Sequence, residues 1–112
     1  MSKTSDRIMR ADFREYLISK CGLKKSSATT YIDALNRVSD LLNYNDVIAG
    51  SIYDIRNLHE LQLVKETAHT LDDYAELNEE KHKNCDMSLN HYYDFAACNW
   101  KFSHKWDIRI YR

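Results

Sequence analysis

The chain has 112 residues, of which 44% are hydrophobic and 29% are charged, a composition that suits one folded domain and disfavours a disordered chain. It contains no proline and only two glycines, so turn-rich all-β folds are disfavoured and a helical protein is expected. Its formal net charge is −1, which excludes a general positive field that would attract nucleic acid to the whole surface.

The three cysteines, Cys21, Cys85 and Cys98, cannot all be paired within the chain because their number is odd. No hydrophobic run approaches the roughly 18 residues needed to cross a bilayer. The polar N-terminus also lacks the apolar core of a signal peptide. We therefore expect reduced thiols, a cytoplasmic location and no contact with a membrane.

The first expected helix covers residues 5–21, with Thr4 or Ser5 as its N-cap and Gly22 as a left-handed residue after its end. Its hydrophobic positions follow helical spacing: Met9, Phe13, Tyr16, Leu17 and Cys21. The second expected helix begins at Ser26 or Ser27, either of which can cap it, and ends before residues 43–46, which favour a turn. Its stripe is the strongest periodic signal in the chain: Ala28, Tyr31, Ile32, Leu35, Val38, Leu41 and Leu42.

Capping pairs mark the next two expected helices. Ser51 and Asp54 are spaced like a capping box, and the helical face that follows consists of Leu58, Leu61, Val64 and Ala68. Thr70 and Asp73 form a similar pair at the start of a helix that runs through Tyr74, Ala75 and Leu77.

Residues 78–86 are polar and predict a helix end and a loop, after which Ser88 caps a last helix. The hydrophobic residues of that helix are Leu89, Tyr92, Tyr93, Phe95 and Ala96. The sequence therefore predicts an all-α domain over residues 1–99, with about five short helices in a compact bundle.

Residues 100–112 form an expected C-terminal tail that is both basic and aromatic. Hydrophobic and polar residues alternate along it, which favours an extended or strand-like conformation. Phe102, Trp106 and Ile110 also follow helical spacing, so a helix stays open as an alternative. We expect the tail to pack on the bundle or to pair with a partner, including a second copy in a homodimer.

The order of landmarks along residues 9–97 is similar to that of a known helical module. The landmarks are Phe13, Tyr16 and Leu17, then Cys21 to Ser27, then Thr29 to Ile32 with Ala34 and Leu35, and finally Ser88 to Phe95. They resemble the N-terminal, SAM-like core-binding domain of tyrosine recombinases and phage integrases, and a related helical domain beside nuclease modules in restriction-type proteins. The resemblance implies a domain that clamps the DNA backbone while a separate catalytic domain performs the chemistry.

Charge is unevenly distributed along the chain. Residues 1–40 carry eight Lys/Arg and five Asp/Glu, residues 41–80 carry two and nine, and residues 81–112 carry six and three. In the first basic region, the start of the second expected helix offers backbone N–H groups, hydroxyls and two lysines to a phosphate. Together with the basic residues of the aromatic tail, the candidate DNA contacts are Lys24, Lys25, Ser26, Ser27, Thr29, Thr30, Lys101, Lys105 and Arg109.

The acidic middle region supports an alternative function. A small phage-type inhibitor or adaptor that blocks a host nuclease or defence complex would use acidic side chains to bind a basic protein partner. The candidate partner-binding residues are Asp72, Asp73, Glu76, Glu79 and Glu80.

No catalytic motif or cofactor-binding motif is present in the sequence, so we expect a protein that is not an enzyme and has no cofactor. Histidine and cysteine side chains that have metal-ligand chemistry occur in the second half: His82, Cys85, His91, Cys98 and His104. His82 and Cys85 have usable spacing for zinc, but the other gaps are irregular, and we predict no metal site.

Overall fold

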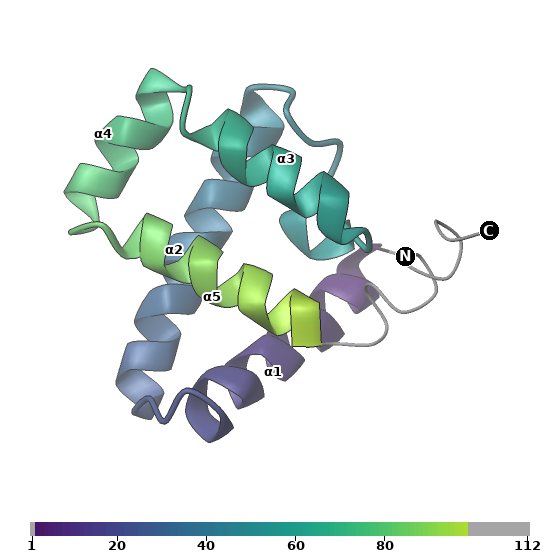
Figure 1. Cartoon of the computed structure of the whole chain (residues 1–112), viewed down its shortest axis with the longest axis vertical. Helices are drawn as coiled ribbons and strands as arrows, with labels where there is room; N and C mark the ends of the chain where they lie inside the picture. The colour runs from purple at the N-terminus through teal and green to yellow at the C-terminus, as the bar shows by residue number, and fades with distance from the viewer. Residues whose placement is uncertain (1, 99–112) are drawn as a thin grey trace.

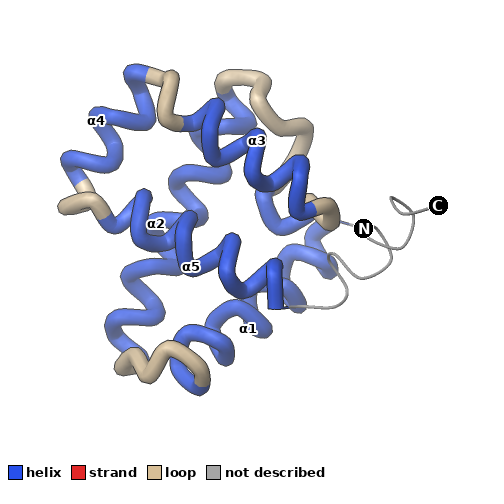
Figure 2. The backbone as a smooth tube through the Cα atoms, viewed as in Figure 1, coloured by secondary structure: helices blue, strands red, loops and turns tan. Residues whose placement is uncertain are grey.

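The computed structural model describes residues 2–98, in which five α-helices and one short 3₁₀ helix are connected by loops (Figure 1). These elements are α1 (Ser2–Ser19), α2 (Lys25–Tyr44), the 3₁₀ helix η1 (Ile52–Asp54), α3 (Leu58–Ala68), α4 (Asp72–Glu80) and α5 (Asn84–Cys98). Figure 2 shows that this part of the chain contains helices and loops but no strand. The all-α bundle that the sequence predicts is confirmed, whereas the expected tail lies outside the described residues.

Helix α5 is the central element, since it packs against α1, α2, α3 and α4. Its inward face buries an aromatic residue that joins two other elements: the Tyr92 ring centroid lies 5.0 Å from that of Phe13 in α1 and 5.6 Å from that of Tyr53 in η1. Both rings meet Tyr92 edge to face, which is a favourable arrangement for aromatic pairs. Burial of these rings fixes how α1 and η1 sit on α5.

The expected caps of the first two helices are wrong. Thr4 and Ser5 lie inside α1, which begins at Ser2. Ser26 and Ser27 lie in the first turn of α2, while Lys24 occupies the N-cap position with extended backbone and no side-chain hydrogen bond. Helix α2 begins this early because the Ala28 side chain is buried and its N–H already donates to the Lys24 carbonyl at 2.9 Å.

Two later caps are also wrong, because their hydroxyls bond to backbone carbonyls instead. Thr70 donates to the Thr67 carbonyl at 2.7 Å, and Leu71 is the N-cap of α4. Ser88 is buried inside α5 and donates to the Cys85 carbonyl at 3.0 Å. Residues 43 and 44 and residues 84–86, which were expected in loops, are helical. A side chain that can cap a helix therefore does not locate its start when its hydroxyl bonds instead to a carbonyl of the preceding turn, as with Thr70, or when the helix extends past it, as with Ser88.

Other local predictions are confirmed. Gly22 has φ +71°, in the left-handed region, and Leu23 N donates to the Leu17 carbonyl at 3.1 Å across it. Ser51 and Asp54 form a true capping box, although it caps η1 and α3 begins only after Asn57. Among the described residues, no helix is both long and apolar enough to span a membrane.

Candidate binding surfaces

The predicted phosphate-binding residues at the start of α2 lie together on the surface. Lys24, Lys25, Ser26, Thr29 and Thr30 are exposed, and Ser27 is half-buried. The N–H groups of residues 25–27 have no hydrogen-bond partner among the described residues, since α2 lacks a side-chain cap. Thr30 differs from its neighbours because its hydroxyl already donates to the Ser26 carbonyl at 3.1 Å.

Helix α1 contributes a cation to this surface that sequence reasoning missed. Arg14 Nη1 donates to Thr29 Oγ1 at 2.9 Å, which brings the guanidinium beside the start of α2. Fifteen positions separate the two residues, so no local pattern in the sequence links them. We call the surface formed by Arg14, Lys24, Lys25, Ser26 and Thr29 the basic corner.

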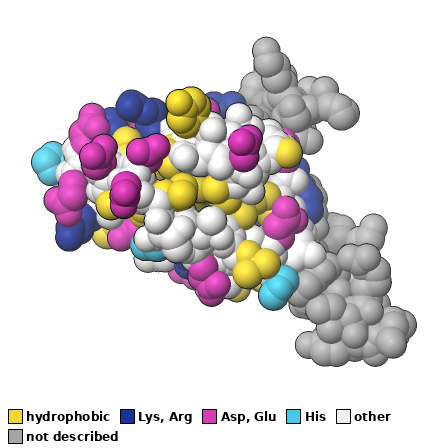
Figure 3. Space-filling view, turned by 90° about the horizontal axis from the view of Figure 1, so that it is seen from above, with side chains coloured by type: hydrophobic (Ala, Val, Ile, Leu, Met, Phe, Trp, Pro, Cys, Tyr) yellow, Lys and Arg dark blue, Asp and Glu magenta, His cyan; other side chains and the backbone are white. Residues whose placement is uncertain are grey.

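The predicted acidic residues all lie on α4 and are exposed: Asp72, Asp73, Glu76, Glu79 and Glu80. Figure 3 shows acidic side chains gathered at the end of the molecule that carries α4, with hydrophobic side chains exposed nearby. Of the five, only Glu79 forms an ion pair within the described residues, with Lys83 Nζ at 3.6 Å from its Oε2. The others leave their negative charge available to a partner.

Three of these carboxylates line a groove of about 470 Å³ between α2 and α4. Helix α4 contributes Asp73, Glu76, Leu77 and Glu80, and α2 contributes Arg37, Asp40, Leu41 and Tyr44. Leu41, Leu77 and the largely exposed ring of Tyr44 are the hydrophobic part of a lining in which carboxylates outnumber the single cation. We call this feature the acidic groove.

The α2 side of the acidic groove was also missed from the sequence, although a signal existed. Arg37, Asp40, Leu41 and Tyr44 follow each other at spacings of three, one and three, which places them on one helical face. Asp72 and Glu79 were predicted with the other acidic residues but do not line the groove. The structure therefore brings together part of the predicted acidic set and adds a carboxylate from α2.

Asp86 in the first turn of α5 positions α4, and with it the acidic face. Its carboxylate accepts hydrogen bonds from Tyr74 Oη and from Asn78 Nδ2 at 3.1 Å, and it pairs with His69 Nε2 at 3.0 Å. Burial alone would raise the pKa of Asp86, but the hydrogen bond from Tyr74, the charge interaction with His69 and the further hydrogen bonds together lower it. Burial and the same hydrogen bond to Asp86 raise the pKa of Tyr74.

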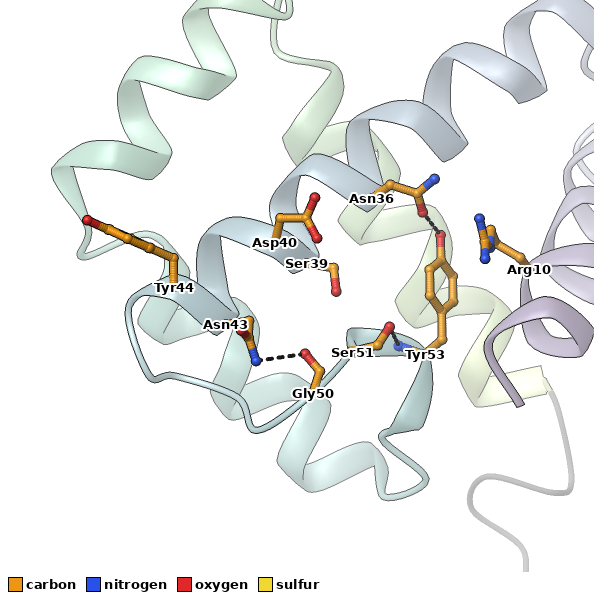
Figure 4. Close-up of a pocket in the computed structure, with 9 residues that line it drawn as sticks. All are labelled: Arg10, Asn36, Ser39, Asp40, Asn43, Tyr44, Gly50, Ser51 and Tyr53. Carbon is orange, nitrogen blue, oxygen red and sulfur yellow. Dashed lines mark hydrogen bonds between the residues drawn. The ribbon is translucent and has the colours of Figure 1, made fainter. Parts of the chain in front are cut away.

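A second pocket, of about 690 Å³, lies between α1, α2 and η1 (Figure 4). Arg10 closes one side, with its guanidinium carbon 5.7 Å from the Tyr53 ring centroid. The Tyr53 hydroxyl donates to Asn36 Oδ1 at 2.6 Å, and Asn43 Nδ2 donates to the Gly50 carbonyl at 3.1 Å. The lining therefore combines one cation, Arg10, and one carboxylate, Asp40, with serine and tyrosine hydroxyls and two side-chain amides.

The histidines and cysteines do not form a metal-binding group of three or more with acidic residues anywhere in residues 2–98. All three cysteines are free, and burial raises the pKa of the Cys85 thiol to about 11. Cys21 Sγ, in the loop after α1, lies 3.8 Å from His91 Nδ1 of α5, and the His91 ring also packs against Tyr31 at 5.3 Å between ring centroids. His104 lies outside the described residues.

Comparison of the chain with protein-family models, with curated proteins and with solved structures finds no match.

Proposed function

We propose that the protein binds nucleic acid by holding backbone phosphates at the basic corner. The observation that carries this proposal is the uncapped start of α2, where unpartnered backbone N–H groups lie beside two lysines and the Arg14 guanidinium. Backbone N–H groups at a helix start, hydroxyls and cations are the groups that bind phosphate in proteins. Lys101, Lys105 and Arg109 would add contacts from the C-terminal tail, which lies outside the described residues.

The stability of the helix does not account for the charges at the start of α2. The first turn of α2 has no acidic residue, although the helix dipole favours negative charge there by about 0.3–1 kcal/mol per group. Lys24 and Lys25 instead place positive charge at this end, where it opposes the dipole. A bound phosphate would reverse this unfavourable arrangement, because it interacts favourably with both the lysines and the dipole.

Replacing Lys24 and Lys25 together by Gln is expected to weaken DNA binding about tenfold, whatever the DNA sequence. The slope of log affinity against log salt concentration should also become less negative by about 2, since two phosphate contacts are lost. Fluorescence anisotropy with labelled single-stranded and double-stranded DNA across a salt series measures both quantities.

The matched control is Lys81→Gln with Lys83→Gln, which changes the net charge equally but at the α4–α5 loop. Binding by the control should stay within twofold of wild type. Equal losses in the two double variants would show a response to net charge alone and would contradict a specific phosphate site. No binding by the wild-type protein at low salt would contradict the function itself.

The acidic groove supports a second candidate function, the binding of a basic protein segment. Asp40, Glu76 and Glu80 would pair with its cations while the groove's hydrophobic residues pack against its apolar side chains. The protein would then act as an adaptor or inhibitor that covers the nucleic-acid-binding surface of a partner. Reversing the charge of Glu76 and Glu80 should abolish such capture and leave DNA binding intact or stronger.

A further inference from the structure

We propose that the acidic groove binds the chain's own C-terminal segment, residues 99–112, within the same molecule. This proposal rests on the second candidate function only in its premise that the groove is a binding surface. The occupant here is the chain's own C-terminal segment. The groove combines the largely exposed Tyr44 ring and the half-buried Leu41, both of α2, with four carboxylates, from Asp40, Asp73, Glu76 and Glu80. A stable occupant must therefore carry cations and large apolar side chains close together.

The C-terminal segment has this composition. It carries Lys101, Lys105, Arg109 and Arg112 against one acidic residue, Asp107. It also contains both tryptophans of the protein, Trp100 and Trp106, together with Phe102, Ile108, Ile110 and Tyr111. Basic side chains next to the groove carboxylates and to the Tyr44 ring would gain both ion pairs and cation–π contacts.

The length of the segment allows this docking in one molecule. Helix α5 starts beside α4 and ends at Cys98, so the chain must return by about the length of α5, roughly 22 Å, to reach α4. Fourteen residues follow Cys98, and in extended conformation they span up to about 46 Å. Lys105 lies seven residues after Cys98 and can extend about 23 Å from it, so the groove is within reach of residues from Lys105 onward, whereas Lys101 lies too close to Cys98.

Docking would couple the groove to the proposed nucleic-acid contacts, because Lys105 and Arg109 cannot pair with groove carboxylates and phosphates at once. The acidic groove would then compete with nucleic acid for the tail. Freeing the tail should strengthen DNA binding about threefold or more, whereas the docking itself does not require any DNA.

The test uses tryptophan fluorescence of the full chain, because Trp100 and Trp106 are its only tryptophans and both lie in the segment. We expect wild-type emission typical of partly shielded indoles. Glu76→Lys with Glu80→Lys should shift the emission to longer wavelength and raise acrylamide quenching about twofold. The matched control, Asp33→Lys with Glu66→Lys, makes the same charge change at exposed sites outside the groove and should match wild type.

A charge exchange decides whether the groove and the tail contact each other directly. Lys105→Glu with Arg109→Glu should by itself release the tail, and its combination with Glu76→Lys and Glu80→Lys should restore shielding. Three results would overturn the proposal. They are fully exposed tryptophans in the wild-type protein, equal effects of the groove and control variants, and no restoration of shielding in the combined variant. Shielding that appears only as protein concentration rises would overturn it in favour of a tail bound to another copy. The tryptophan fluorescence test involves no DNA, so it decides the docking proposal even if anisotropy shows that the protein binds no DNA.

Discussion

Phe13→Ala is expected to lower the free energy of unfolding by about 3–5 kcal/mol, which makes it the most damaging single change that we predict. Phe13 is fully buried, and its ring centroid lies 5.0 Å from that of Tyr92 and 5.5 Å from that of Phe95. Truncation would leave a cavity where α1 meets α5, because both neighbouring rings belong to the central helix. Urea unfolding followed by far-ultraviolet circular dichroism measures the loss.

Leu63→Ala in α3 is a suitable control, since the Leu63 side chain is 48% exposed and its removal opens no cavity. Its effect should stay below about 0.5–1 kcal/mol. A loss below about 1 kcal/mol for Phe13→Ala would contradict the packing of α1 against α5. Because α1 carries Arg14, the same result would also remove the geometric basis of the basic corner.

Hydrophobic periodicity was enough to predict the helices, because burial of one face is what stabilises them. The second expected helix illustrates this: Ala28, Leu35, Val38 and Leu42 are all fully buried in α2. Helix ends were predicted less well, since the capping serines compete with tertiary packing that extends a helix. Ser88 shows the reason, as its hydroxyl is satisfied by the Cys85 carbonyl inside α5 and is not needed at an N-terminus.

The candidate surfaces were predicted only in part, because each combines one segment of sequence with another that is distant from it. Lys24 and Lys25 could be found from local pattern, but the position of Arg14 depends on how α1 packs on α2. Likewise, the acidic residues of α4 stand out in the sequence, whereas Asp40 joins them only through packing of α4 beside α2. Local patterns predict which residues share an element, and contacts between elements decide which of them share a site.

The two proposed surfaces lie toward opposite ends of α2, so positive and negative charge are separated along this helix. The basic corner surrounds the start of α2, and Tyr44 in the acidic groove is its last residue. Asp40, the groove carboxylate on α2, lies 15 residues from Lys25, or about 22 Å along the helix, which is well beyond the screening length of about 8 Å at physiological salt. The groove carboxylates therefore do not cancel the field at the basic corner, and a net charge of −1 is compatible with a local phosphate site.

Asp86→Ala is expected to cost about 2–3 kcal/mol of stability at pH 7 and to loosen α4 from α5. The change leaves the buried Tyr74 hydroxyl and the Asn78 amide without their charged acceptor, and hydrogen bonds to charged groups are the costlier ones to lose. The partial exposure of the Asp86 side chain, at 36%, keeps the expected loss below that of a fully buried ion. Urea unfolding gives the total loss, and amide hydrogen exchange within α4 should accelerate more than exchange within α2.

The stability difference between wild type and Asp86→Ala should shrink as pH falls from 5 toward 3. The fold lowers the pKa of Asp86, so its contribution is present above its unfolded pKa, near 4, and is lost as pH falls through the lower folded value. Asp94→Ala provides a control on the same helix, because the Asp94 side chain is exposed; its effect should stay within about 0.5 kcal/mol at any of these pH values. A difference for Asp86→Ala that is as large at pH 3 as at pH 7 would mean that the ionised carboxylate does not hold α4, and that packing of Tyr74 and Leu77 alone positions the acidic face.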